Sequence, residues 1–371
     1  MAANEHLNKK LEELQEEYSK TRYNKATNKH LGLLRAKIAN IRKEMEQKRG
    51  RKGTGFSVKK TGDATVALVG FPNAGKSSLL KRLTDVESKV ADYAFTTVDV
   101  IPGMMGYSGA NIQVLDLPGL IPGAHVGRGE GRKIISVVRV SDLILFLIDA
   151  KEPGHVYDLI KELEELNIRV NKKAPSIRFE RKETFGIKIE AGKFKVPDRR
   201  TIIDLLKEFG IFNAEMIFWQ DADVDEIVDV VAGNCTYMKG IVALNKIDVV
   251  DGASLTKHIN EIKSRTGMEV IPISVTKGIN IEQLKSEVFK GLELLRIYLK
   301  PKDGKPDFEK PMIMGRGATV MDAARKLNSK TAKNAKFANI TGASAKFVNQ
   351  KVGIEHPLAD GDIITLIYDK A

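Results

Sequence analysis

Residues 70–77 have the residue types and the spacing of a phosphate-binding loop. Glycines let the backbone curl so that several N–H groups point at one anion, and a following helix adds its positive end. The lysine is placed to bridge β- and γ-phosphate oxygens, and the serine hydroxyl to bind Mg²⁺. The run matches GxxxxGK[ST] and reads Gly70-Phe71-Pro72-Asn73-Ala74-Gly75-Lys76-Ser77, with Ser78 adjoining it. Because a strand is expected at 65–69 and a helix at 78–83, we predict a nucleotide-phosphate site.

A second motif, at residues 245–248, indicates which base is bound. It reads Asn245-Lys246-Ile247-Asp248 and follows an apolar run that we expect to be a strand. The Asp248 carboxylate can accept hydrogen bonds from guanine N1–H and the exocyclic amine, whereas adenine offers no matching donor pair. After the next expected strand, Ser274-Val275-Thr276 is placed to touch the base through backbone and hydroxyl groups. These residues predict that the nucleotide is GTP or GDP.

Two further segments are placed to hold Mg²⁺ and to respond to the γ-phosphate. Asp116 opens Asp116-Leu117-Pro118-Gly119 at the end of an expected strand, where phosphate-loop proteins hold Mg²⁺ through an acid. Phe95-Thr96-Thr97 lies where a mobile loop can bring a threonine to Mg²⁺ and the γ-phosphate. Loops of this kind are ordered by the γ-phosphate and released after hydrolysis. The four motifs, which run along the chain in the order 70–77, 95–97, 116–119 and 245–248, predict a Mg²⁺-dependent GTPase that acts as a switch.

Composition excludes several classes of protein. Hydrophobic residues are 42% and charged residues 29% of the chain, which excludes wholesale disorder. The single cysteine, Cys235, cannot form an internal disulfide or a multi-cysteine zinc site, which fits a reducing compartment. Apolar runs are too short to cross a bilayer, and the N-terminus has no apolar signal-peptide core. We therefore predict a soluble, cytoplasmic protein without a membrane partner.

The net charge of +12 is concentrated at the two ends of the chain. Residues 1–60 carry 16 Lys and Arg against 7 Asp and Glu, and residues 300–371 carry 13 against 8. Basic appendages on a nearly neutral body favour a polyanionic partner, for which RNA or the ribosome is the leading candidate. The alternative is a solvated surface with surplus lysine.

Hydrophobic patterning predicts an α/β protein with appendages. Apolar residues at helical spacing predict a pair of helices within 1–48, followed by a basic, glycine-rich linker. From about residue 62, short apolar runs alternate with helical stretches, which is typical of a parallel sheet with covering helices. The stretch 168–237 interrupts this rhythm, and we interpret it as an inserted α+β subdomain with Phe218 and Trp219 in its core.

The tail of the chain has its own pattern. A helix is expected to end near Tyr298, and a proline-rich linker follows it. Beyond the linker, we expect strands at 312–314 and 363–368 and a helix at 320–327.

Across essentially its whole length the chain resembles the developmentally regulated GTP-binding (DRG) proteins of the Obg-related GTPases. The segments that carry the resemblance are 24–38, 70–80, 91–97, 116–131, 211–215 and 245–248. It implies an N-terminal helical hairpin and linker (1–60), a Ras-like G domain (61–299), an inserted subdomain like ribosomal protein S5 domain 2 (168–237), and a C-terminal TGS domain of β-grasp fold (300–371). It also implies association with translation and ribosomes, and Asn73 in the loop favours an archaeal member.

The resemblance bears on hydrolysis as well. The residue after the DxxG motif is Leu120, where well-studied small GTPases have a water-orienting glutamine, so we expect slow turnover. Related GTPases with asparagine at the position of Asn73 use it to hold K⁺ between the phosphates, and by analogy Thr97 rather than Thr96 binds Mg²⁺. The predicted catalytic residues are therefore Lys76, Thr97 and Asn73. The alternatives are that Asn73 only satisfies its own turn, or that Arg128 and Arg132 reach the phosphates.

Two other functions remain open at this stage. The chain can be a GTP-dependent protein-scaffolding switch without an RNA role, with a protein regulator bound by the hairpin or the TGS domain. A metabolic phosphate-loop kinase is disfavoured because residues 245–248 select guanine.

Overall fold

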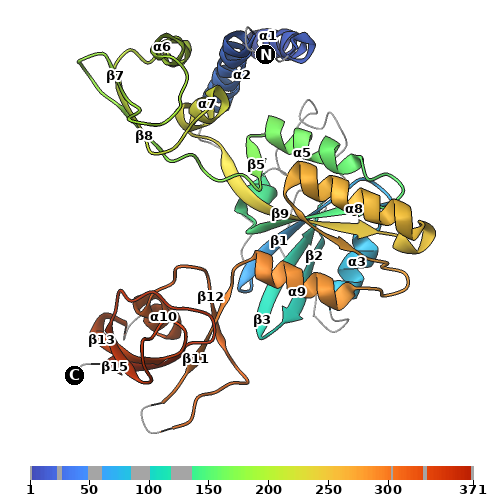
Figure 1. Ribbon diagram of the computed structural model, residues 1–371, viewed down its shortest axis with the longest axis vertical. Helices are drawn as coiled ribbons and strands as arrows, with labels where there is room; N and C mark the ends of the chain where they lie inside the picture. The colour runs from blue at the N-terminus through green and yellow to red at the C-terminus, as the bar shows by residue number, and fades with distance from the viewer. Residues whose placement is uncertain are drawn as a thin grey trace. The chain divides into compact units, whose positions relative to one another are not determined.

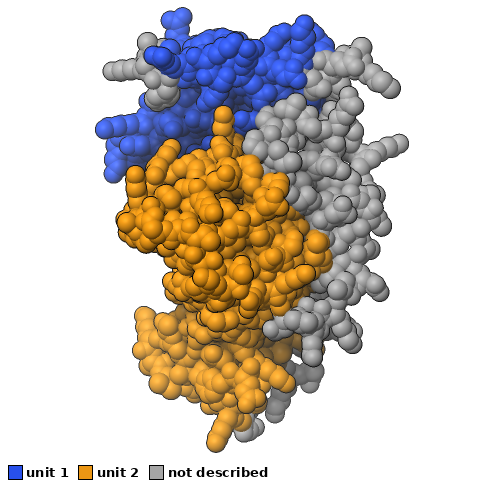
Figure 2. All heavy atoms as spheres, turned by 90° about the vertical axis from the view of Figure 1, so that its right-hand side faces the viewer, with its two compact units in different colours: residues 1–56, 163–237 blue, residues 57–162, 238–371 orange. Residues whose placement is uncertain are grey.

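The structure is a computed structural model that describes residues 2–22, 27–48, 61–84, 101–117, 136–301, 304–328 and 332–368. The chain forms two compact units, coloured in Figure 2. One combines Met1–Phe56 with Leu163–Tyr237, and the other combines Ser57–Glu162 with Met238–Ala371. Each unit is thus built from two separate stretches of the chain.

The sheet that positions the candidate site is mixed. Its strands lie in the order β10-β9-β4-β1-β3-β2, with bounds β1 (Ala64–Val69), β2 (Ile101–Tyr107), β3 (Ala110–Asp116), β4 (Leu143–Asp149), β9 (Thr236–Asn245) and β10 (Glu269–Pro272), and β5 (Ile168–Val170) also pairs with β9. Figure 1 labels β1, β2, β3 and β9 of this sheet. Strands that are neighbours in the stated order are parallel except β2, which is antiparallel to β3. Because parallel strands share a carboxyl edge, the loops that follow β1, β3, β4, β9 and β10 gather at one edge of the sheet.

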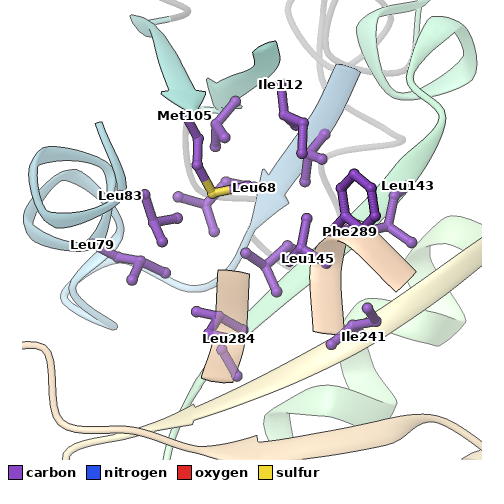
Figure 3. Close-up of a cluster of buried hydrophobic side chains, with 14 of the residues drawn as sticks. Leu68, Leu79, Leu83, Met105, Ile112, Leu143, Leu145, Ile241, Leu284 and Phe289 are labelled. Carbon is purple, nitrogen blue, oxygen red and sulfur yellow. The ribbon is translucent and has the colours of Figure 1, made fainter. Parts of the chain in front are cut away.

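Helices cover this sheet, and their bounds are α3 (Lys76–Leu83), α5 (His155–Glu165), α8 (Gly252–Thr266) and α9 (Ile281–Gly291). On one face, Leu79 of α3 and Leu284 of α9 share a core with Leu68 of β1 (Figure 3). Every residue of β1 is buried, as are Leu143–Ile148 of β4. Burial on both faces explains why these strands are continuous apolar runs, and the predicted α/β architecture is confirmed.

The unit formed by Met1–Phe56 and Leu163–Tyr237 has a separate core. Its elements are α1 (Ala2–Lys20), α2 (Asn28–Lys48), β5 (Ile168–Val170), β6 (Ile177–Arg181), β7 (Ile187–Glu190), α6 (Arg199–Glu208), β8 (Ala214–Phe218) and α7 (Val224–Ala232). Ala36 of α2, Ile202 of α6 and Met216 of β8 belong to one hydrophobic cluster. A Cβ at Gly32 would lie 2.1 Å from a methyl carbon of Val224, so α2 and α7 approach each other at a glycine.

Charged side chains are buried in the same unit. The Arg169 guanidinium donates two hydrogen bonds to the Asp229 carboxylate, at 2.8 and 2.7 Å, and both side chains are less than one-tenth exposed. Arg35 of α2 pairs with Asp225 and lies 3.7 Å from Asp229. The pairs of Arg35 join α2 to α7, and the Arg169–Asp229 pair joins β5 to α7.

The C-terminal part has a five-stranded sheet in the order β12-β11-β15-β13-β14. The elements are β11 (Leu295–Leu299), β12 (Met312–Met314), α10 (Val320–Leu327), β13 (Ala335–Thr341), β14 (Gln350–Gly353) and β15 (Ile363–Tyr368). Thr319 caps α10 and exchanges hydrogen bonds with Asp322 in a capping box. Val320 of the helix and Ile364 of β15 belong to one buried cluster, as expected for a helix packed on a sheet.

Two expectations from the sequence are wrong. Residues up to Tyr298 do not continue a helix, because α9 ends at Gly291 and β11 pairs with β12 and β15. Trp219 is not in the core of the insert, because it is 58% exposed, whereas Phe218 is buried. Strand alternation accounts for the second error, since adjacent residues at a strand end face opposite ways. The expected linker at 49–60 lies outside the described residues.

Among the described residues, no helix combines the length and apolar composition that a membrane span requires.

Candidate functional site

The predicted phosphate loop connects β1 to α3 at the carboxyl edge of the sheet. Gly75 has φ of 99°, and a Cβ there would lie 2.8 Å from the side-chain amide nitrogen of Asn245. A Cβ at Gly70 would lie 2.6 Å from the carbonyl oxygen of Leu147. Both glycines are therefore required by close packing against β4 and β9. Lys76 is the first residue of α3, and Ser77 and Ser78 follow in its first turn.

Lys76 bends back over the loop that precedes it. Its Nζ donates hydrogen bonds to the carbonyl oxygens of Gly70 at 3.0 Å and Phe71 at 3.1 Å. Burial lowers the pKa of Lys76, against the opposing charge of Asp116. A cation held over curled backbone at a helix N-terminus can bind phosphate oxygens.

Ser77 and Asp116 meet beside the loop. The register of β1 and β3 pairs Leu68 with Asp116, and the Ser77 hydroxyl donates to Asp116 Oδ2 at 2.8 Å. Burial raises the pKa of Asp116, while the Ser77 hydrogen bond and the Lys76 charge oppose this shift. Within the part of the chain that the structure describes, the other carboxylate oxygen, Oδ1, is buried without a hydrogen-bond partner. A hydroxyl and a carboxylate oxygen with a free lone pair are the hard donors that Mg²⁺ prefers, so this pair fits the ion.

Asn245 joins three loops through one buried side chain and its backbone. Its amide nitrogen donates to the carbonyl oxygen of Ala74 at 2.9 Å, and its amide oxygen accepts from the N–H of Val275 at 3.1 Å. The backbone oxygen of Asn245 accepts from the N–H of Ala150 at 2.8 Å. The loops after β1, β4 and β10 are thus fixed to the end of β9.

Lys246 holds the phosphate loop from the next position. It has φ of 63°, and its Nζ donates to the backbone oxygen of Asn73 at 3.1 Å. Asn73 is itself in the left-handed region, with φ of 64°, and its residue is exposed. The conformation of Asn73 agrees with an asparagine that satisfies its own turn, and the exposed side chain remains available to a ligand.

Asp248 lies in a short 3₁₀ helix (Ile247–Val249) after β9. The Ser274 hydroxyl, together with a backbone N–H and the charge of Lys277, lowers the pKa of Asp248 despite the opposing effect of desolvation. Ser274 is fully buried, and Arg82 of α3 donates to the backbone oxygen of Thr276 at 3.2 Å. An ionised carboxylate of this kind can accept hydrogen bonds from two neighbouring donors on a planar base.

The structure brings the phosphate loop, Asp116, residues 245–248 and residues 274–276 to one edge of the sheet. The residues predicted there whose placement is not described are Phe95, Thr96, Thr97, Gly119, Leu120, Arg128 and Arg132. Sequence reasoning missed Asp149 and His155, which contact Lys246 and Phe71. The available signal for Asp149 was its position, because it ends an apolar strand next to the other strand ends that carry the site.

Comparisons with known proteins define the class. A family model described as a 50S ribosome-binding GTPase matches residues 65–182, and one for the C-terminal region of that domain matches 184–294. A TGS domain model matches residues 295–368. With the geometry above, these matches define a GTP-binding protein that has a phosphate-loop GTPase domain.

Full-length relatives give the family. The chain is 43% identical over 370 residues to an uncharacterized GTP-binding protein of Methanocaldococcus jannaschii, covering 98% of this chain and 93% of that one. It is 40% identical over 365 residues to developmentally-regulated GTP-binding protein 1 of Xenopus laevis, covering 96% and 98%. It is 39% identical over 369 residues to developmentally-regulated G-protein 2 of Arabidopsis thaliana, covering 97% and 91%. The chain therefore belongs to the developmentally regulated GTP-binding protein family, as its motifs predict.

Proposed function

We propose that the protein hydrolyses GTP to GDP and phosphate with Mg²⁺ and works as a slow molecular switch. The observation that carries this proposal is the Ser77–Asp116 pair, in which a buried carboxylate oxygen is left without a hydrogen bond beside the loop that carries Lys76. Mg²⁺ held there would neutralise phosphate charge. Lys76 would hold the phosphates, Asp248 would read guanine, and Ser274, Val275 and Thr276 would adjoin the base.

The slow rate follows from Leu120, which cannot orient water. We assign the second Mg²⁺ contact to Thr97, in a loop with Phe95 and Thr96, and we place Gly119 at the γ-phosphate. We assign to Asn73 a share in holding K⁺, which would supply the positive charge that other GTPases obtain from an arginine. The exposed residue 73 on a loop whose backbone Lys246 anchors supports this role.

Phosphate release measured with GTP and ATP, each with Mg²⁺ and with EDTA, tests the proposal. We expect turnover only with GTP and Mg²⁺. Equal turnover of ATP, or Mg²⁺-independent turnover, would overturn the assignment.

The proposed partner is the ribosome or another RNA in the cytoplasm. The surplus of basic residues in 1–60 and 300–371 supports a polyanionic partner. Co-sedimentation with ribosomes at rising salt tests it, and we expect binding that weakens as salt rises. Absence of binding at low salt would favour the alternative, in which the hairpin or TGS domain binds a protein regulator.

A further inference from the structure

A small cavity lies against the phosphate loop where β4 ends and α5 begins. Its volume is about 240 Å³, and residues 71–74 of the loop form part of its lining. Asp149, the last residue of β4, and His155, the first residue of α5, line it together with Glu152 and Lys246. None of the four predicted motifs includes Asp149, Glu152 or His155. Asp149 nevertheless contacts Lys246, and His155 contacts Phe71 of the phosphate loop.

Asp149 reaches the loop through Lys246. Its Oδ2 accepts from Lys246 Nζ at 2.7 Å, and the same Nζ donates to the backbone oxygen of Asn73 at 3.1 Å. The second oxygen, Oδ1, accepts from the N–H of Lys151 at 2.9 Å, which fixes the carboxylate. Burial raises the pKa of Asp149, but these hydrogen bonds and the Lys246 charge outweigh it, so the group stays ionised. Asp149 therefore orients the long, flexible side chain of Lys246 toward the backbone oxygen of Asn73.

That backbone atom belongs to the strained residue of the loop. The left-handed conformation of Asn73, with φ of 64°, is less favourable for an asparagine than for a glycine. A hydrogen bond to its carbonyl, donated by a lysine that Asp149 orients, offsets this strain. The curl of the loop depends on that conformation, since it determines where the neighbouring N–H groups point.

His155 supports the other end of the loop. Its imidazole stacks on the Phe71 ring with centroids 4.2 Å apart and planes inclined by 30°. Its Nδ1 lies 3.4 Å from the exposed carboxylate of Glu152. The stacked pair restricts Phe71, whose backbone oxygen accepts from Lys76 at 3.1 Å.

We infer that Asp149 and His155 are positioning residues of the phosphate loop: Asp149 acts through Lys246 on Asn73, and His155 acts through stacking on Phe71. The inference rests on the proposed guanine nucleotide site. Neither Asp149 nor His155 is among the residues proposed to contact the nucleotide. Replacing either one should therefore change how long the nucleotide stays bound and leave the preference for guanine unchanged.

The test is the rate at which a fluorescent GDP leaves the full-length protein. Asp149→Asn should release GDP about 3- to 10-fold faster, because the lysine is no longer held by a charge. Asp158→Asn is the matched control, since it removes an exposed acid of α5 that does not line the cavity, and should leave the rate unchanged. In a Lys246→Met background, Asp149→Asn should have no accelerating effect. An unchanged rate in Asp149→Asn, or the same acceleration in both backgrounds, would overturn the role of Asp149.

A second pair of variants separates stacking from general damage. His155→Ala should release GDP faster, whereas His155→Phe, which restores a ring beside Phe71, should return the rate to within about twofold of the unmutated protein. Equal rates in all three proteins would overturn the role of His155. Failure of the unmutated protein to bind GDP would instead refute the proposed function. The relative affinities of each variant for GDP, GTP and ATP are measured as well. They should stay unchanged if only positioning is lost, whereas a variant that unfolds would not keep them.

Discussion

The side-chain amide of Asn245 donates to the carbonyl oxygen of Ala74 across 2.9 Å, although the two residues are 171 positions apart in the chain. The motif that was expected to read the base therefore also holds the loop expected to bind phosphates. The oxygen of the same amide accepts from Val275, next to the predicted base contacts. The segments predicted to recognise the base and to bind the phosphates are thus joined by Asn245, which is only 3% exposed.

Base specificity should change with Asp248. In Asp248→Asn, GTP binding should weaken by roughly tenfold or more, because an amide cannot accept both guanine donors. Xanthosine nucleotides should gain in relative affinity, since xanthine replaces the exocyclic amine by an oxygen. Competition binding with GTP and XTP measures the switch. An unchanged GTP affinity would remove the assignment of Asp248 to the base.

Turnover should depend on the phosphate and Mg²⁺ contacts. Lys76→Ala and Ser77→Ala should each lower the rate of phosphate release by at least about 100-fold, since phosphate charge or Mg²⁺ is then uncompensated. Ser264→Ala, at an exposed hydroxyl of α8, is a control for loss of a serine and should turn over normally. Retained turnover in the first two variants would place the phosphate site elsewhere.

Potassium should accelerate hydrolysis. At equal ionic strength, KCl should give faster phosphate release than NaCl, and Asn73→Ala should reduce the difference. An electrostatic contact of this kind contributes on the order of 2–4 kcal/mol, or roughly 10²–10³ in rate. Steady-state release in matched salts is the measurement. Equal rates in both salts would refute the role of K⁺ and return attention to Arg128, Arg132 or an external activator.

The Mg²⁺ requirement should depend on pH through Asp116. Burial raises the pKa of Asp116, so protons compete with Mg²⁺ for this carboxylate at higher pH than at an ordinary aspartate. As the pH falls through that raised pKa, the Mg²⁺ concentration for half-maximal turnover should rise, and it should fall as the pH rises. Titrations of turnover against Mg²⁺ between pH 5 and pH 8 measure this shift. A pH-independent requirement would show that Asp116 does not hold the ion.

The buried pair of Arg169 and Asp229 should dominate the stability of its unit. Arg169→Met should lower the free energy of unfolding by about 3 kcal/mol, because it leaves a buried carboxylate with weaker partners. Lys188, which pairs with Glu190 and Glu215 at the surface, is the control, and Lys188→Ala should have little effect. Denaturant unfolding followed by the fluorescence of Trp219, the sole tryptophan of the sequence, reports on this unit. Equal destabilisation by the two substitutions would contradict the assignment.

The residues expected to contact the nucleotide are easier to predict from the sequence than the residues that hold them in place. Phosphate and base contacts follow from short motifs, because their chemistry dictates residue types at fixed spacing. Asp149 has no such spacing: it is one acid at the end of an apolar run, and only the register of β4 with β9 pairs it with Asn245. The backbone oxygen of Asn73 likewise accepts a hydrogen bond from Lys246, which is far away in the chain. Tertiary contacts of this kind leave no local pattern.

Fold prediction fails for a related reason. Leu295–Leu299 is apolar enough for either a helix end or a strand, and its hydrogen bonds to β12 and β15 decide between them. The strands buried on both faces, such as β1 and β4, and the helix α10 with its capping box are set by local sequence, and these predictions are confirmed.

The discontinuity of the unit that contains α2 has a consequence for how the protein is made. Ala36 packs in one cluster with Ile202 and Val228, so the face of α2 around Ala36 has no covering partner until α6 and α7 have been synthesised, whereas Ile41 and Met45 pack with Leu7 of α1. α2 therefore leaves the ribosome before the helices that complete its burial. Contacts between residues so far apart in sequence also slow folding, because a long loop must close before they form. In a nascent chain that is halted before residue 202, the face of α2 around Ala36 is open to chaperones.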